Sequence, residues 1–190
     1  MSRDRIVRVA TLLAVLGVAG CASVPKARFV HPEFDFGYVE RVAVLPFGNL
    51  SPVRDAGEKA GRLFITELLA TGAVDVVEPG EVRAAVEAVL GGGTDPTTEQ
   101  IQALGKRLGV QALVLGTVTE FETVRSGASS VPVITIDAHM VETESGATVW
   151  AATHTVRGTT FSSRVFGSGA LAGAEAMRRC VHELVEALTS

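Results

Sequence analysis

The sequence has 190 residues, of which 47% are hydrophobic and 20% are charged, with a formal net charge of −4 at pH 7. This composition is typical of one globular domain that is long enough to bury a sizeable core, and it excludes extended disorder. The acidic balance and the lack of any Lys- or Arg-rich run argue against nucleic acid as a partner.

The chain begins with a basic stretch followed by an apolar run. Arg3, Arg5 and Arg8 precede the apolar residues 9–19, which is the layout of a signal peptide with its charged and hydrophobic regions. A membrane-spanning helix needs about 20 apolar residues, so this run is too short to span a bilayer. We therefore expect residues 1–20 to be a signal peptide.

The small residues 18–20 lead directly into Cys21. This order resembles the bacterial lipobox, which implies cleavage before Cys21 and acylation of its thiol and of the new amine. The alternative is a secretory signal with a chance cysteine near its cleavage site. Several acyl chains hold a protein stably on a membrane, so Cys21 is the predicted lipidation site. Ala22 and Ser23 follow with no aspartate, which by the lipoprotein sorting rule implies the periplasmic side of the outer membrane.

Cleavage would change the charge and leave one other cysteine. Without its three basic residues and one acidic residue before position 21, the mature chain has a net charge of −6. Cys180 then has no partner in its own chain, and a buried thiol is favoured over an intermolecular disulfide. Residues 21–40 lack a sustained hydrophobic period and are interpreted as the lipidated N-terminus and tether, whose later half packs on the domain formed by residues 41–190.

Hydrophobic periodicity from residue 41 onward predicts an alternation of strands and helices. A short strand over residues 42–45 is followed by a helix over about 54–70, with Gly72 as its stop. A strand over 73–78 precedes a helix that begins at Pro79 and ends at the glycines 91–93.

The second half of the domain has a clearer hairpin pattern. Thr97 and Gln100 have the spacing of a capping box, which predicts a helix that runs to Gly109. Strands are expected over 111–121, 131–142 and 147–156, followed by a helix over about 174–188. The predicted fold class is α/β (α+β): a single domain with a mixed β-sheet layered with helices, in the order β-α-β-α-α-β-β-β-α.

Asp137, His139 and His154 form the best candidate cluster for metal or acid-base chemistry. If residues 143–146 form the hairpin turn, His154 falls opposite Thr135, roughly 13 Å along the strand from His139. Two imidazoles at that separation cannot share a metal bound at about 2 Å. We therefore interpret these side chains as solvated sheet positions and predict no catalytic, cofactor-binding or metal-binding residues.

Other polar or glycine-rich features have ordinary structural interpretations. Gly167, Gly169 and Gly173 have the spacing of a dinucleotide loop, but only one helix remains before the chain ends, which favours a flexible loop that leads into that helix. Cys180 and Trp150 are expected to pack in the core. The last helix also has a set of charged or titratable residues expected on a solvated face: Glu175, Arg178, Arg179, His182, Glu183 and Glu186.

Four segments carry a family resemblance: "RVAVLPFGNLS", "TGAVDVVEPGEV", "LGVQALVLGTVTEFE" and "ESGATVWAATHTVRG". In this order they are similar to a group of bacterial periplasmic lipoproteins and domains that includes CsgG of curli secretion, LpoB and the N-terminal domain of TolB. The similarity covers about residues 41–188, with Asn49 and the Gly146 to Trp150 segment as the closest local matches. It implies a mixed α/β domain that is used as an interaction platform in the cell envelope.

Two departures from that group make a self-sufficient pore and a direct activator role less favoured for this chain. The spans 122–132 and 157–169 are too short and too rich in Gly and Ser to supply the long hairpins of a pore, and the tether is short. The sequence therefore predicts a lipid-anchored, non-enzymatic protein that binds other envelope proteins, and copies of itself, in assembly or secretion. Two alternatives stay open: a small periplasmic hydrolase or metal-dependent enzyme that uses Asp137 and His139, and an activator of a cell-wall synthase.

Overall fold

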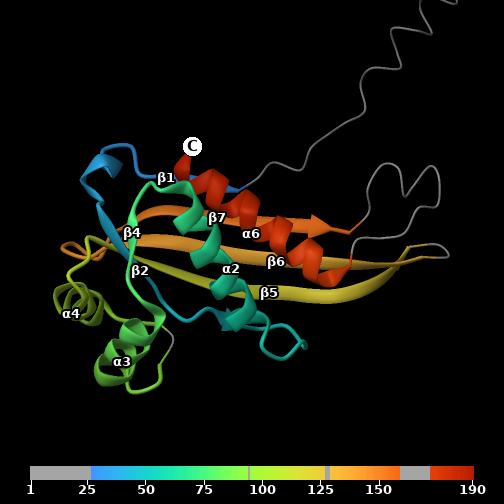
Figure 1. The fold of residues 1–190 in the computed structure, drawn as a ribbon, viewed down its shortest axis with the longest axis horizontal. Helices are drawn as coiled ribbons and strands as arrows, with labels where there is room; N and C mark the ends of the chain where they lie inside the picture. The colour runs from blue at the N-terminus through green and yellow to red at the C-terminus, as the bar shows by residue number, and fades with distance from the viewer. Residues whose placement is uncertain (1–26, 94, 127–128, 159–171) are drawn as a thin grey trace, which may run out of the picture.

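The computed structural model describes residues 27–93, 95–126, 129–158 and 172–190. Within these residues, seven strands form one sheet in the order β1-β7-β6-β5-β2-β4, with β3 paired to β5. Helices lie on both faces of this sheet (Figure 1). The predicted fold class, a mixed sheet layered with helices in a single domain, is confirmed.

The parallel side of the sheet is built by the first half of the domain. β2 (Arg41–Val44) pairs in parallel with β4 (Asp75–Val76) and with β5 (Ala112–Ser126), and the short β3 (Gly48–Asn49) pairs in parallel with β5 further along. Residues 42–44 of β2 are all buried, because helices cover both faces of the sheet at this strand. A strand covered on both faces needs a continuous apolar run, and β2 has one.

The helices begin and end close to where the sequence signals predict. They are α2 (Ala56–Thr71), α3 (Pro79–Leu90), α4 (Thr98–Leu108) and α6 (Gly173–Thr189). Thr97 and Gln100 form the predicted capping box in full. Gly72 ends α2 in the left-handed conformation at a φ of 63°, which glycine adopts without the steric cost that a Cβ would bring.

The antiparallel side of the sheet contains β5, β6 (Ser129–Glu142) and β7 (Thr148–Arg157). The predicted turn over residues 143–146 is confirmed, and the Glu142 amide donates to the Ala147 carbonyl at 2.9 Å. The span 122–132, which the sequence places mostly in a connection, is mostly strand. Pairing across the ladder, for example between Val124 and Val131, extends both strands beyond their apolar runs.

Two elements precede residue 41 that the periodicity did not predict. β1 (Arg28–Val30) pairs antiparallel with β7 and places Val30 opposite Trp150, and a short 3-10 helix, η2 (Phe36–Tyr38), follows. Three residues are too few to show a hydrophobic period. β1 is a strand because it pairs with β7. Phe36 packs against the core, in agreement with the expectation that the later part of this segment joins the domain.

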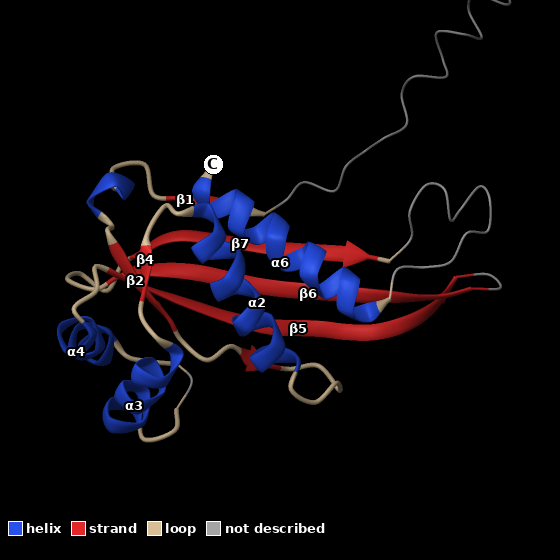
Figure 2. Ribbon diagram, in the orientation of Figure 1, coloured by secondary structure: helices blue, strands red, loops and turns tan. Residues whose placement is uncertain are grey.

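The sheet separates two apolar cores, and Figure 2 shows the helices that lie against it. α2 and α6 cover one face, where the largest buried side chains include Phe64, Leu68, Ile134, Ile136, Trp150 and Leu184. α3 and α4 cover the other face over β2 and β5, where Leu45, Val82, Leu104 and Leu113 are buried and Val141 is the contribution of β6. On this second face, which we call the open face, Thr153 and Thr155 of β7 are exposed.

Candidate functional site

A β-bulge near the start of β7 sets the position of every residue that follows in that strand. Val141 lies opposite Thr148, but Met140 lies opposite Trp150, so Val149 is the extra residue. Pairing continues without a further shift to the end of β7. The predicted turn gives the correct partner for Val141, which is Thr148. It gives no sign of the bulge that follows.

The bulge changes the face on which His154 lies. His154 is opposite Ile136, and not opposite Thr135 as predicted. Because a slip of one residue moves a side chain to the other face of a sheet, His154 points toward α6 while Asp137 and His139 lie on the open face. The predicted cluster is therefore divided by the sheet. The expectation that His154 is solvated is wrong, since it is 8% exposed.

Asp137 and His139 remain together on the open face. They line a shallow depression of about 650 Å³ whose other residues include Phe29 and Thr153. Thr153 Oγ1 donates to Asp137 Oδ1 at 2.6 Å. Burial lowers the pKa of His139, an effect that the negative charges of Asp95 and Asp137 partly oppose. In the part of the chain that the structure describes, no three His, Cys, Asp or Glu side chains are grouped so that they could hold a metal ion.

His154 instead takes part in a polar contact between β7 and α6. Its Nε2 lies 2.6 Å from Glu183 Oε2, and Arg179 Nε donates to the other carboxylate oxygen of Glu183 at 2.9 Å. The Glu183 side chain is only 20% exposed, so both of its oxygens are engaged at the edge of the core. Charged groups withdrawn from water need such partners, and this arrangement joins the helix to the strand.

Cys180 lies beside this contact and confirms the prediction of a buried thiol. It is free of any disulfide, and its Sγ donates to the carbonyl oxygen of His154 at 3.4 Å. Burial raises the pKa of Cys180 to about 12, with a further contribution from the charge of Glu183. A thiol of this kind carries almost no thiolate at neutral pH, so it is a packing residue and not a nucleophile.

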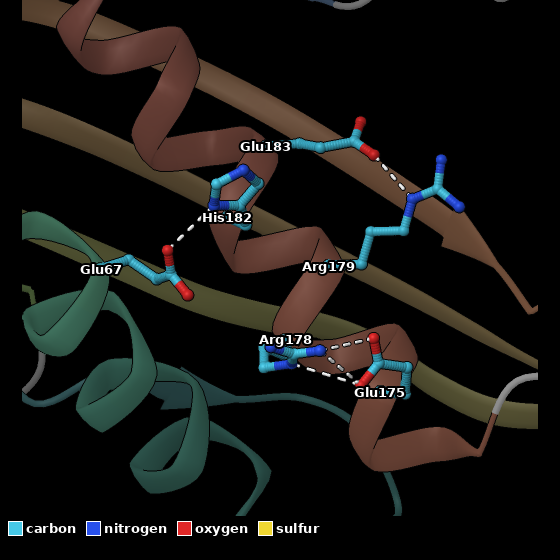
Figure 3. Close-up of polar contacts among 6 residues, drawn as sticks. All are labelled: Glu67, Glu175, Arg178, Arg179, His182 and Glu183. Atoms are coloured by element: carbon cyan, nitrogen blue, oxygen red, sulfur yellow. Dashed lines mark hydrogen bonds and ion pairs between the residues drawn. The ribbon is translucent and has the colours of Figure 1, made fainter. Parts of the chain in front are cut away.

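The outer surface of α6 matches the predicted solvated face, except at Glu183 (Figure 3). His182 Nδ1 lies 2.9 Å from Glu67 Oε2 on α2, and this hydrogen bond is the main reason that the pKa of His182 is raised. Arg178 donates to both carboxylate oxygens of Glu175 one turn away. These pairs link neighbouring turns of α6, and they link α6 to α2.

Trp150 is the packing anchor that the sequence predicted. It is 1% exposed, and its indole Nε1 donates to the Ala187 carbonyl near the end of α6 at 3.3 Å. An apolar cavity of about 360 Å³ lies beside it, with Val30 and Leu188 among the lining residues. The glycines 91–93 also behave as predicted, because Gly91 ends α3 in the left-handed conformation.

Several predicted positions lie outside the described residues. These are the signal peptide, Cys21, and the glycines at 167 and 169 of the Gly-rich loop. Gly173 is described and is the first residue of α6. In the described part of the chain, no helix is both long enough and apolar enough to cross a membrane.

The outer edges of β5 and β7 are partly unpaired, which the sequence did not predict. β5 is paired on its outer side by β2 and β3 only as far as Val118, and β7 is bonded on its outer side only as far as Thr153, whose amide donates to the Ala27 carbonyl. Beyond these points, within the described residues, each strand pairs only with β6. An unpaired edge is a template for another strand. The β-branched residues in "FETVR" indicate a strand, but no local signal shows which side of it is unpaired.

Comparison with known proteins identifies the fold. No protein-family model matches the sequence, and no curated protein matches it either. Among solved structures, the PelC dodecamer from Paraburkholderia phytofirmans matches with a TM-score of 0.58 at 18% identity, over 85% of this chain and 96% of that chain. Lipoprotein GNA1162 from Neisseria meningitidis matches with a TM-score of 0.54 at 19% identity, over 79% of this chain and 98% of that chain.

The C-terminal domain of LpoB from Salmonella enterica is more distant. It matches with a TM-score of 0.49 at 13% identity, over 66% of this chain and 87% of that chain, and at that score the likeness carries no weight. The class defined by the stronger matches is a mixed α/β domain whose fold also occurs in a bacterial lipoprotein and in PelC. At such low identity the shared property is the fold alone, so membership of the CsgG, LpoB and TolB group stays a prediction.

Proposed function

We propose that this chain is a lipid-anchored protein of the bacterial envelope that faces the periplasm from the outer membrane. It acts without catalysis as an interaction module, and it binds other envelope proteins and copies of itself in assembly or secretion.

One combination of observations carries the proposal. The lipobox-like sequence that ends at Cys21 precedes a domain whose fold occurs in lipoprotein GNA1162 and in the PelC dodecamer. The lipoprotein match supports an anchored domain, and the dodecamer match supports self-association. A domain that presents an open sheet face and unpaired strand edges has surface available for both kinds of partner.

The polar side chains of the domain are consistent with this role. His154, Glu183 and Arg179 contact one another between β7 and α6. Asp137 is engaged by Thr153 in a shallow depression. Metal analysis of the purified protein tests the rival activity at Asp137 and His139: stoichiometric zinc that is lost in His139→Ala would contradict a non-enzymatic module.

The anchor is tested by Cys21→Ser, with Cys180→Ser as the matched control. We expect Cys21→Ser to abolish labelling by a fatty-acid probe, and either to move the protein from the outer-membrane fraction to the soluble fraction or to leave the signal peptide uncut. Cys180→Ser should label and fractionate like the wild type, because that thiol is buried. A Cys21→Ser protein that still incorporates the probe would show that another residue carries the lipid.

A further inference from the structure

We propose that the edge of the sheet formed by β1, together with η2, rests on the surface of the lipid bilayer that holds the anchor. The side chains of Phe29, Val30 and Tyr38 contact the lipid there. This inference rests on the proposed function, which includes a lipid at Cys21, and it adds the orientation in which the anchored domain lies. The partner is a lipid surface without net charge, and not a further protein.

The segment that contains β1 and η2 has most of the exposed large apolar side chains. In the described part of the chain there are five such side chains, and three of them belong to this segment: Phe29, Val30 and Tyr38. Each of the three is between 42% and 46% exposed. Single exposed apolar residues are normal on a protein surface, but several on one short segment mark a site of contact.

The place of β1 in the sheet sets the direction of this contact. Phe29 lies opposite Ala151 and Val30 lies opposite Trp150, and successive residues of a strand point to opposite faces. Phe29 is therefore on the open face, and Val30 is on the face covered by α6. Both are exposed because β1 is the last of the described strands at its end of the sheet. One flat surface can touch both side chains only if it meets the sheet along this edge.

The anchored segment joins the domain at the same edge. Cys21 is seven residues before Arg28, the first residue of β1, so an extended chain between them spans at most about 25 Å. At the opposite edge, β3 lies four strand intervals from β1, or about 19 Å away. Figure 1 shows β1 along one margin of the domain and α3 and α4 along the other. The short tether therefore keeps the β1 edge close to the bilayer.

The backbone of β1 limits how deeply this edge can enter the bilayer. The Ala27 carbonyl and the His31 amide are both hydrogen bonded to β7, at 3.1 Å and 2.8 Å. Outward groups alternate with inward ones, which directs the N–H and C=O of Arg28 and Val30 away from the sheet. In hydrocarbon these groups would lack hydrogen-bond partners, whereas water and lipid headgroups supply them. The edge therefore stays at the level of the headgroups, and only side chains reach the hydrocarbon boundary.

Tyr38 has the form expected of a residue at that boundary. Its hydroxyl donates to Glu144 Oε1 at 3.3 Å, while the side chain as a whole is exposed. Aromatic rings with a polar end are enriched where hydrocarbon meets water. Tyr38 thus supplies an apolar contact together with a polar group that stays hydrated.

Charge indicates which kind of lipid surface fits. Residues 27–40 contain one arginine and three carboxylates: Arg28, Glu33, Asp35 and Glu40. An anionic membrane attracts basic segments, so an acidic one such as this gains nothing from it. The contact therefore depends on apolar burial against zwitterionic lipid. The acyl chains supply the binding strength, and the exposed side chains set the orientation, with the outer edge of β5 turned away from the bilayer.

Quenching by spin-labelled lipid tests the orientation. The lipidated protein is bound to vesicles of phosphatidylcholine and phosphatidylethanolamine that contain a lipid with a spin label on its headgroup. A fluorescent probe is attached at Phe29→Cys or, as the matched control, at Leu50→Cys. Leu50 is 76% exposed and directly follows β3 at the opposite edge of the sheet. Cys180 is buried and Cys21 carries the lipid, so the probe reacts with the introduced thiol.

We expect most of the fluorescence to be lost at residue 29 and little to be lost at residue 50. Vesicles without the spin label give the reference intensity for each variant. Equal quenching at the two positions, or none at residue 29, would overturn the proposal.

Polar substitutions test whether the apolar side chains are responsible. The probe is moved to Glu33→Cys, between β1 and η2, and Phe29→Ser, Val30→Ser and Tyr38→Ser are combined in one chain. Quenching at residue 33 should fall several-fold in this triple variant and stay unchanged in Leu50→Ser. Undiminished quenching in the triple variant would contradict a contact made by these side chains.

The charge of the lipid provides a further check. Salt should leave the quenching at residue 29 unchanged, and added phosphatidylglycerol should not increase it. Quenching that rises with phosphatidylglycerol and falls with salt would show that the contact is electrostatic, which opposes the proposal.

Sedimentation with the vesicles separates this inference from the proposed function. Every variant used here keeps Cys21 and should sediment with the lipid. Sedimentation without quenching at residue 29 rejects the orientation and leaves the anchor in place. A wild-type protein that stays in solution would mean that the anchor itself is wrong, and the inference fails with it.

Discussion

The Nε2 atom of His154 lies 2.6 Å from the Oε2 atom of Glu183, across the contact between β7 and α6. His154 is there because the bulge at Val149 turns it toward the helix, and Glu183 faces it from the edge of an otherwise solvated helix surface. This contact joins β7 to α6, and it accounts for a histidine that the sequence suggested as a candidate for chemistry.

Removal of this carboxylate should weaken the packing of α6. Because Glu183 accepts from Arg179 and contacts His154 at the edge of the core, Glu183→Ala is expected to lower the free energy of unfolding by about 1 to 3 kcal/mol. Urea unfolding followed by circular dichroism measures the change. Glu186→Ala, at an exposed position on the same helix, should change it by less than about 0.5 kcal/mol. Equal effects of the two substitutions would show that the contact contributes nothing specific.

The pair of His182 and Glu67 should give a pH-dependent stability. The hydrogen bond that His182 donates to Glu67 raises the pKa of His182 in the folded protein. The contribution of this pair to stability is therefore fully present below the unfolded pKa of about 6.5 and is lost as the pH rises through the folded pKa. Glu67→Gln should therefore destabilise the protein at about pH 5.5 and have little effect at about pH 8.5. The effect is small, because the His182 side chain is 62% exposed.

An NMR titration of His182 checks the same pair directly. The pKa of His182 should fall in Glu67→Gln. Glu58→Gln is the control, since Glu58 pairs on the same helix with Arg62, which does not titrate in this range. If the pKa of His182 fell as far in Glu58→Gln as in Glu67→Gln, general charge effects would be responsible for the shift.

Cys180 should resist thiol reagents while the protein is folded. Its pKa of about 12 and its burial leave neither thiolate nor access at about pH 8. Labelling with an aromatic disulfide reagent should be slow in buffer and complete in denaturant. An exposed thiol introduced by Thr153→Cys should react at once and serves as the comparison. Rapid reaction of Cys180 in buffer would mean that α6 separates from the sheet in the native state.

Gly116 should not tolerate a side chain. A Cβ at this position would lie 2.5 Å from a ring carbon of Phe47, and Phe47 is itself buried in the core. Gly116→Ala is expected to reduce the free energy of unfolding by about 1 to 3 kcal/mol, since a buried ring can move only by disturbing its neighbours. Gly80→Ala in α3 meets no atom within 4 Å and should be neutral or stabilising by up to about 1 kcal/mol. Thermal unfolding measures the stability of both variants. A Gly116→Ala protein as stable as the wild type would contradict the tight contact with Phe47.

Much of the fold could be predicted from local signals. The capping box at Thr97, the proline that begins α3 and the glycine that ends α2 all depend on residues within one helical turn, and such signals can be read without a partner. The buried Trp150 and Cys180 were also predicted, because apolar periodicity assigns them to the core side of their elements.

The features that escaped prediction depend on how each strand pairs with its neighbours. β1 has three residues and exists through its pairing with β7, and β5 extends to Ser126 through its pairing with β6. The position of His154 depends on a bulge whose residues are as apolar and β-branched as an ordinary strand. Neither the period nor the composition of "ATVWAATHTV" reveals which residue is left unpaired.

By itself, the sequence determined the helices, the longer strands and their order, the helix termini and core residues such as Trp150 and Cys180, because each follows from hydrophobic period or from contacts within a few residues. The tertiary structure alone decided the sheet order, the face on which His154 lies and the edges that stay unpaired. The physical reason is that a strand is completed by its neighbours: a single residue inserted in a ladder reverses the faces beyond it, and an edge is unpaired only with respect to the strands that the whole chain brings beside it.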